Sequence, residues 1–268
     1  MLAEGNTSVN ERITRADGGR RRAPAVGALP GTTWYARLKG AVDFVLALVL
    51  FIVLAPVMLL TIALVRLTSR GPAIYRQKRL GLHGRIYTIY KIRTMTYNCE
   101  SRSGPQWCKA GDPRVTPVGR FLRKTHLDEL PQLWNVLRGD MSLVGPRPER
   151  PEFLPVLEQS IAHYRERLQV RPGVTGLAQV QLPPDTDVGS VRRKLACDLY
   201  YVYRLGFWLD VRLLFATAFK VLGLPFGLTR KLLRVPSGRD VELLYKSLDH
   251  KVEKDEEVPE LEPALQNA

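Results

Sequence analysis

An apolar run of twenty-two residues, from Phe44 to Val65, contains no charged side chain. As a straight helix it would be about 33 Å long at ~1.5 Å per residue, which matches the hydrocarbon core of a bilayer. The run starts more than forty residues into the chain and no small-residue cleavage site follows it, so a cleavable signal peptide is not expected. We therefore expect this segment to be embedded in a phospholipid membrane.

Two features bear on whether the apolar run crosses the membrane. Pro56 lies near its middle, where a proline removes a helix hydrogen bond and kinks or breaks the helix. Basic residues flank both ends, whereas a spanning helix has its excess of Lys and Arg on the cytoplasmic side. Both features favour a re-entrant helix over residues 34–70, broken at Pro56. A Pro-kinked spanning helix is the alternative.

The net charge of +14 is unevenly distributed along the chain. Residues 249–268 contain seven acids and two lysines, so the preceding part of the chain carries +19. This surplus predicts polyanionic partners: nucleic acid, anionic lipid or a phosphorylated substrate. The three cysteines lack the spacing of a zinc site, which indicates a reduced, cytosolic environment.

Two segments with β character, 73–79 and 85–95, flank the turn signal Gly81–Gly84 and predict a β-hairpin. Because side chains alternate along a strand, the second segment puts Lys91 and Arg93 on one face. These two cations form either a solvated strand face or a clamp for phosphate. Helices are expected over residues 151–168, 191–204 and 207–224, and a long loop over 97–117.

The helix expected over 207–224 allows two interpretations. Arg212, Ala216 and Lys220 form one stripe at i, i+4 spacing, as in a helix that lies in a membrane interface. A buried core helix is the other interpretation. The aromatic residues that suit an interfacial depth are Tyr200, Tyr201, Tyr203 and Trp208.

Two adjacent carboxylates, Asp128 and Glu129, lie within a basic stretch of the chain. A carboxylate can attack phosphorus or bind a divalent metal, and nearby guanidinium and ammonium groups neutralise phosphate charge. Arg120, Arg123 and Lys124 provide such groups. This combination of acids and bases is what chemistry on an anionic phosphate requires.

A helix is expected from about Asp128 to Arg138, because Pro131 suits a first turn and Gly139 ends the apolar spacing. The acids would then lie at a helix N-terminus, where free N–H groups and the macrodipole attract a substrate phosphate. The structural alternatives are that Asp128 is simply an N-cap, or that Thr125 caps the helix as part of a capping box.

A conformationally restricted arginine follows these acids. Pro146 and Pro148 flank Arg147 and fix the backbone on either side of it. Few sequences hold a guanidinium group so rigidly. An ordinary proline-rich turn with a surface arginine is the alternative.

Three segments together resemble the bacterial sugar transferase family, which comprises monotopic phosphoglycosyl transferases: Tyr90–Met95, Thr116–Glu149 and Arg171–Val180. The resemblance covers about residues 37–225. It implies an enzyme that transfers a sugar 1-phosphate from a UDP-sugar to a polyprenyl phosphate such as undecaprenyl phosphate, and releases UMP. Members start the assembly of exopolysaccharide, capsule, O-antigen or glycoprotein glycans.

The resemblance also implies residue roles and a Mg²⁺ cofactor. Asp128 is expected to be the nucleophile, to form a covalent phosphosugar intermediate and to bind the metal, with Glu129 assisting it. Pro56 matches the break in the family's membrane helix. The other expected catalytic residues are Arg123 and Lys91, and the expected substrate-binding residues are Arg147, Pro146, Pro148, Arg93 and Arg120.

The expected fold is therefore mixed α and β, mainly helical with a small β-hairpin or sheet, in a monotopic membrane protein with interfacial helices. The expected location is the cytoplasmic face of the bacterial inner membrane. A homodimer is left open, as is the identity of the sugar. The expected parts are a disordered basic tail (1–33), a re-entrant helix (34–70), a cytoplasmic catalytic domain (71–228) and a C-terminal extension with an acidic tail (229–268).

The alternative function is a non-enzymatic, membrane-anchored basic adaptor that binds anionic lipid or nucleic acid. Such an adaptor does not need acids within its basic cluster, yet Asp128 and Glu129 lie there. The chain also lacks the aromatic and basic repeats that bind nucleic acid, so no nucleic-acid partner is expected.

Overall fold

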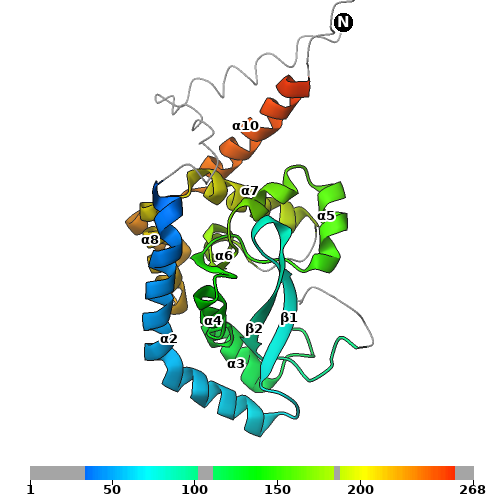
Figure 1. Cartoon of the computed structure of the whole chain (residues 1–268), viewed down its shortest axis with the longest axis vertical. Coiled ribbons are helices and arrows are strands. Elements are labelled where there is room, and N and C mark those ends of the chain that lie inside the picture. Colours follow the sequence, from blue (N-terminus) through cyan, green and yellow to red (C-terminus); the bar gives the residue numbers. More distant parts are fainter. Residues whose placement is uncertain (1–33, 102–110, 184–187, 257–268) are drawn as a thin grey trace, which may run out of the picture.

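The computed structural model describes residues 34–101, 111–183 and 188–256 (Figure 1). The tail expected over 1–33 and the acidic end at 257–268 lie outside the described residues. Within the described parts, the protein is mainly helical and contains two small two-stranded sheets. The mixed, mainly helical fold expected from the sequence is confirmed.

The apolar run lies in one long helix, α2 (Trp34–Thr68). Pro56 is inside α2 and the helix continues through it. Figure 1 shows α2 passing along one side of the molecule and then bending beneath it. A proline removes one hydrogen bond and bends the axis, but the neighbouring bonds of the ladder persist. The expected break is therefore a bend within a continuous helix.

The predicted hairpin is confirmed. β1 (Ile74–Leu80) pairs antiparallel with β2 (Ile86–Ile92), and the 3₁₀ turn Leu82–Gly84 joins them. A second sheet, in which β3 (Ser142–Val144) runs parallel to β4 (Gly173–Thr175), was not predicted. Strands of three residues are too short to show a period of two, so the sequence carries no signal for them.

The helices expected over 191–204 and 207–224 are confirmed as α7 (Val188–Arg204) and α8 (Phe207–Val221). The single helix expected over 151–168 is wrong, because Ile161 is extended and His163 is left-handed (φ 62°). These residues separate α5 (Leu154–Ser160) from the 3₁₀ segment Tyr164–Gln169. The other helices are α3 (Pro117–Thr125), α4 (Gln132–Leu137), α6 (Leu177–Gln181), α9 (Phe226–Leu233) and α10 (Gly238–Glu256), with further 3₁₀ turns at Leu127–Glu129 and Pro151–Phe153.

The main hydrophobic core joins β2, the parallel strands, α4 and α6 to α8. Ile89 of β2, Leu143 of β3 and Leu213 of α8 are buried in it. A second cluster joins α5, α7 and α10, with Leu195 and Leu244 buried between the last two helices. Residues 238–248 are therefore part of the folded body, although the sequence suggested only an extension.

A buried polar cluster attaches the first part of α2 to this body. Lys39 Nζ lies 2.5 Å from Asp210 Oδ2 of α8 and 3.3 Å from Asp43 Oδ2. The Tyr201 hydroxyl donates to Asp210 Oδ1 over 2.7 Å, and the Ser142 hydroxyl donates to Asp43 Oδ2 over 2.6 Å. Buried charges are stable only when they are paired and hydrogen-bonded. The cluster therefore fixes how α2 sits against α8 and β3.

The far end of α2 also packs on the body. Val65 is buried in a third hydrophobic cluster with Ala73, Ile92 of β2 and Leu122 of α3. The Arg66 guanidinium donates to the main-chain oxygen of Gly71 over 2.8 Å. Both ends of α2 therefore contact one and the same folded body.

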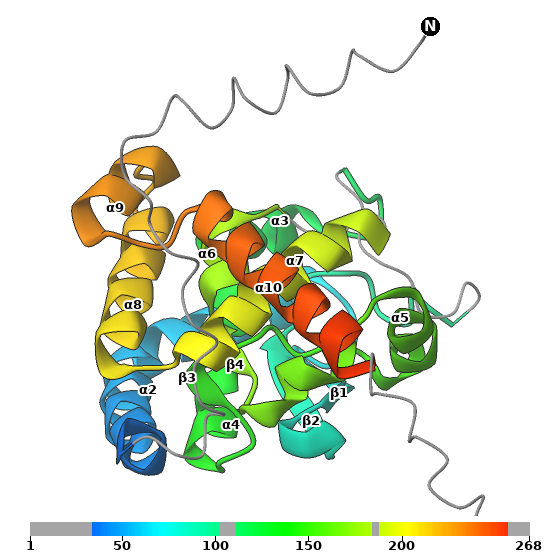
Figure 2. The same cartoon turned by 90° about the horizontal axis from the view of Figure 1, so that it is seen from above.

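The stripe expected on α8 (Arg212, Ala216 and Lys220) is partly covered by the rest of the chain. Ala216 is completely buried, and Lys220 Nζ donates to the main-chain oxygen of Gln179 over 2.5 Å. Tyr201 is also buried. Helical spacing alone does not show which side of a helix the rest of the chain covers. Figure 2 shows α2, α8 and α9 along one side of the molecule, and the exposed apolar residues of α8 and α9 are Phe207, Trp208, Phe215, Val221, Leu228 and Leu232.

Candidate active site

Asp128 and Glu129 lie in a 3₁₀ turn between α3 and α4. The helix expected to start at Asp128 is wrong, because α4 begins only at Gln132 and has six residues. His126 adopts the left-handed region (φ 58°), which ends α3 and leaves room for a single tight turn before α4. The acids are therefore not at an α-helix N-terminus. Neither of the two expected helix caps is present. Within the described chain, the Asp128 side chain accepts no hydrogen bond from a backbone N–H. The Thr125 hydroxyl instead donates a hydrogen bond to the main-chain oxygen of Phe121.

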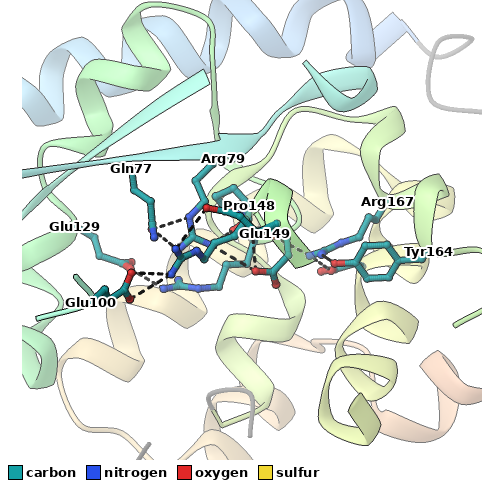
Figure 3. Close-up of polar contacts among 12 residues, drawn as sticks. Gln77, Arg79, Glu100, Glu129, Pro148, Glu149, Tyr164 and Arg167 are labelled. Atoms are coloured by element: carbon teal, nitrogen blue, oxygen red, sulfur yellow. Dashed lines mark hydrogen bonds and ion pairs between the residues drawn. The ribbon is translucent and has the colours of Figure 1, made fainter. Parts of the chain in front are cut away.

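Glu129 is held by two cations from separate parts of the chain. Lys91 Nζ of β2 lies 2.8 Å from Glu129 Oε1, and Arg147 Nη2, from the loop after β3, lies 3.1 Å from the same oxygen. Figure 3 shows Glu129 together with Pro148 and Glu149, which follow Arg147 in that loop. Charge-assisted hydrogen bonds of this kind are the strong ones. Glu129 therefore joins the hairpin to the loop that contains Arg147.

The surroundings of the Asp128 carboxylate differ from those of Glu129. It is only 8% exposed. Within the part of the chain that the structure describes, no group donates a hydrogen bond to its carboxylate or forms an ion pair with it. A buried carboxylate is stable when a partner satisfies it, so this arrangement suits a ligand that brings its own positive charge or reacts with the oxygen. Asp128 is the member of the pair that is available for chemistry.

The electrostatic environment separates the two acids further. Burial and the neighbouring Glu129 charge raise the pKa of Asp128 to about 6, against the opposing effect of Lys91 and Arg147. Burial alone would also raise the pKa of Glu129, but Lys91 and Arg147 outweigh it and hold that pKa well below its ordinary value. Adjacent acids whose pKa values are driven apart have separate roles. Glu129 stays ionised, while Asp128 gains or loses its proton near neutrality.

The structure brings together Lys91, Asp128, Glu129 and Arg147, with Pro146 and Pro148 buried on either side of the arginine. Arg123 of α3 is close enough for its charge to lower the pKa of Asp128. Its Nε donates to the Thr94 hydroxyl over 2.8 Å.

Two expected substrate-binding residues lie apart from this group. Arg93 Nη2 donates to the Ser69 main-chain oxygen over 3.0 Å, at the end of α2, so it does not form a clamp with Lys91. Strand β2 ends at Ile92, so the alternation that paired the two cations does not extend to Arg93. Arg120 is exposed on α3, and none of its contacts within the described residues reaches the acids.

Two further basic side chains near the acids, His126 and Lys220, were not expected. Burial lowers the pKa of His126, and the Glu129 charge opposes that change. Burial and repulsion from Arg147 lower the pKa of Lys220, which α8 carries to the site. His126 directly precedes the turn, so its proximity to the acids could have signalled a role. Lys220 lies 91 residues after Glu129 in the sequence, and its place in the expected α8 stripe gave no sign that it reaches the acids.

A metal at this site would depend on few protein ligands. No group of three or more His, Cys, Asp or Glu side chains able to hold a metal occurs among the described residues. Mg²⁺ is nevertheless commonly bound by one or two carboxylates together with substrate phosphates and water. Asp128 is largely buried and its carboxylate has no hydrogen-bond donor among the described residues, so it fits that requirement.

Comparison with known sequences places the chain in a family. The sequence profile described as "Bacterial sugar transferase" matches residues 34–223, from the start of α2 to just beyond α8. The protein therefore belongs to the bacterial sugar transferase family. Helices α9 and α10 lie beyond the matched segment.

Two relatives are named for sugar-phosphate transfer with undecaprenyl phosphate, and a third is named for exopolysaccharide production. The chain is 41% identical over 197 residues to a UDP-N-acetylgalactosamine-undecaprenyl-phosphate N-acetylgalactosaminephosphotransferase of Aeromonas hydrophila, covering 74% of this chain and 46% of that protein. It is 45% identical over 183 residues to a UDP-glucose:undecaprenyl-phosphate glucose-1-phosphate transferase of Caulobacter vibrioides, covering 67% of each. The Rhizobium leguminosarum bv. phaseoli exopolysaccharide production protein PSS is 40% identical, with 67% of this chain and 92% of that protein covered. The chain thus spans about half the length of the Aeromonas protein.

Proposed function

We propose that this protein is a phosphoglycosyl transferase that moves a sugar 1-phosphate from a UDP-sugar to a polyprenyl phosphate and releases UMP. The observation that carries the proposal is the difference between two adjacent acids. Glu129 is bound by Lys91 and Arg147, whereas Asp128 is buried with its carboxylate unengaged within the described structure. The reactions named for the relatives support the same conclusion.

In the proposed first step, a carboxylate oxygen of Asp128 attacks the phosphorus that carries the sugar. An acyl phosphate bond forms, the bond to the bridging oxygen breaks, and UMP leaves with that oxygen. In the second step, a phosphate oxygen of the polyprenyl phosphate attacks the same phosphorus and regenerates Asp128. A covalent intermediate lets a water-soluble and a lipid-soluble substrate use one site in turn.

The cations around the acids support the transfer of a phosphoryl group, because charge neutralisation and positioning do most of the catalysis in such reactions. Lys91 and Arg147 keep Glu129 ionised and place two positive charges beside Asp128. Asp128 would hold Mg²⁺, and the diphosphate and water would complete its ligands. Bound there, Mg²⁺ would neutralise charge on the diphosphate.

A panel of UDP-sugars tests the proposed reaction. We expect the purified full-length protein to release UMP from at least one of UDP-glucose, UDP-galactose and their N-acetylated forms in the presence of undecaprenyl phosphate. EDTA should abolish the release and added Mg²⁺ should restore it, because the diphosphate needs a counter-ion. Absence of UMP with every sugar nucleotide would instead favour a basic, membrane-anchored adaptor.

We further propose that α2 enters the membrane and returns to the cytoplasmic face. By length and composition it is one helix that could cross a membrane. A crossing would separate its ends by about 30 Å of hydrocarbon. Lys39 and Val65, near opposite ends, are instead both buried against the same body. A site at the membrane surface would also meet a lipid-linked acceptor.

Cysteine labelling tests this topology. Arg37 and Arg70 are exposed near the two ends of α2. With the native cysteines replaced by serine, we expect Arg37→Cys and Arg70→Cys each to react with a membrane-impermeant maleimide only from the cytoplasmic side. Labelling of the two positions from opposite sides of the membrane would refute the re-entrant arrangement.

A further inference from the structure

The guanidinium groups of two arginines, Arg167 and Arg79, donate hydrogen bonds to the main chain of the loop that contains Arg147. Arg167 Nη2 donates to the main-chain oxygen of Arg147 over 2.7 Å, and Arg79 Nη1 donates to the main-chain oxygen of Pro148 over 2.9 Å (Figure 3). Pro146 and Pro148 have no N–H to donate. The position of this segment therefore depends strongly on what its carbonyl groups accept.

Arg167 is itself rigidly held. It lies in the 3₁₀ segment before β4, and only 7% of its side chain is exposed. The same Nη2 contacts Asp198 Oδ2 of α7 over 2.7 Å, and Nη1 donates to the Tyr164 hydroxyl over 2.7 Å. The planar fork of an arginine allows it to serve several acceptors in fixed directions. The carbonyl of Arg147 is thus linked to the interior of the molecule.

Arg79 provides the matching contact on the hairpin side. Its Nη2 and Nε donate to the Gln77 side-chain oxygen over 2.7 and 3.0 Å, and Nη1 lies 3.6 Å from Glu149 Oε1. The main-chain N–H of Leu80 also donates to Glu149 O over 2.9 Å. These contacts join β1 to the loop immediately after Arg147.

The side chain of Arg147 has no comparable support of its own. Its side chain is 44% exposed while the guanidinium contacts Glu129. Packing therefore does little to fix the direction of this side chain, and the position of its main chain must decide whether it reaches Glu129. Arg167, which is buried, and Arg79, which is half-buried, donate hydrogen bonds to that main chain.

We propose that Arg79 and Arg167 are positioning residues that hold the main chain of Arg147 and Pro148 so that the Arg147 guanidinium reaches Glu129. The proposal rests on the proposed function, in which Arg147 and Glu129 organise the charge around Asp128. A misplaced Arg147 would leave Glu129 with Lys91 as its remaining cation and would weaken charge neutralisation at the reacting phosphate.

The support extends to a part of the chain outside the family match. Tyr164, which accepts the Arg167 hydrogen bond, belongs to the same buried cluster as Leu244 and Tyr245 of α10. Residues 34–223 match the family, so α10 is an addition to that segment. In this chain, α10 therefore packs in the cluster that contains Tyr164, the hydrogen-bond partner of Arg167.

Arg167→Lys is the direct test, with Arg165→Lys as the matched control. Arg165 lies in the same 3₁₀ segment but is exposed and contacts Glu158 of α5. Lysine keeps the charge beside Asp198 but loses the fork that reaches the carbonyl. We expect kcat/KM for UMP release to fall about tenfold to a hundredfold in Arg167→Lys, since small misplacements cost that much. The control should keep the wild-type value.

A double-mutant cycle separates positioning from general loss of structure. If Arg167 acts through Arg147, Arg167→Lys should add little to the loss already present in Arg147→Ala. Equal losses in the wild-type and Arg147→Ala backgrounds would overturn the proposal. Should Arg167→Lys fail to fold, Arg79→Lys tests the other carbonyl contact, with the exposed Arg76→Lys as its control.

Hydrogen exchange gives a readout that does not depend on catalysis. In Arg167→Lys, exchange in the peptide spanning residues 145–150 should be about tenfold faster than in Arg165→Lys, because the loop loses an anchor. Unchanged exchange would overturn the positioning role. If the wild-type protein releases no UMP from any sugar nucleotide, the proposed function fails, while this measurement still decides whether Arg167 holds the loop.

Discussion

Asp128→Asn is expected to abolish UMP release, with kcat/KM falling more than about a thousandfold, as when a catalytic nucleophile is removed elsewhere. Asparagine keeps the size and shape of the side chain, but an amide oxygen is a poor nucleophile and carries no charge to hold a divalent cation. Because the Asp128 carboxylate has no hydrogen-bond partner within the described structure, the change should leave the fold intact.

Asp140→Asn is the matched control for this variant. Asp140 is a partly exposed acid after α4 whose carboxylate contacts Arg138 and Asn135. We expect near wild-type UMP release from it, measured in the same assay. Undiminished release by Asp128→Asn would contradict the assignment of Asp128 as nucleophile.

Glu129→Gln is expected to lower kcat roughly tenfold to a hundredfold and to move the acid limb of the pH profile to lower pH. In the proposed mechanism, Asp128 must lose its proton before it attacks, so kcat/KM of the wild-type protein should rise as the pH increases through about 6, the pKa of Asp128. Substitution removes the negative neighbour that raises this pKa. It also leaves Lys91 and Arg147 without their carboxylate partner, and their charges then act on Asp128.

Both consequences of Glu129→Gln lower the pKa of Asp128, so the acid limb of the pH profile should move to lower pH. The measurement is kcat/KM for UMP release as a function of pH. Glu100→Gln is the control, because Glu100 is paired with Arg150 and, among the described residues, forms no ion pair with Lys91 or Arg147. The acid limb should not move in this variant. A limb that stays in place or moves to higher pH in Glu129→Gln would contradict the proposed coupling.

The division of labour between the two acids follows from their neighbours. A carboxylate that is paired with two cations is poorly nucleophilic, because its lone pairs are already engaged. Glu129 is in this state, and it in turn gathers positive charge around Asp128. We therefore propose that the unengaged acid reacts and that the engaged acid organises the site.

The elements that were predicted correctly are long and strongly patterned. The apolar run of α2, the hairpin and helices α7 and α8 all have periodicity or turn signals that extend over several residues. Lys91, Asp128, Glu129 and Arg147 were expected at one site because the segments that carry them resemble those of a known family, and the fold places them together.

The errors arose where the surrounding structure decides the local conformation. The left-handed His126 and the tight turn after it replaced the expected helix start at Asp128. Arg93 lies just beyond β2, where strand alternation no longer holds. The stripe on α8 has the spacing of an interfacial helix, yet the side that contains Ala216 is covered by the rest of the chain. Spacing shows that residues share a face but does not show what that face contacts.

The reaction is tested most directly by mass spectrometry of the protein incubated with a UDP-sugar that it uses and Mg²⁺, without polyprenyl phosphate. We expect one equivalent of UMP and a mass increase of one sugar phosphate on the peptide that contains Asp128, with neither in Asp128→Asn. UMP release that begins only when polyprenyl phosphate is added, with no adduct on that peptide, would contradict a covalent aspartyl phosphosugar intermediate.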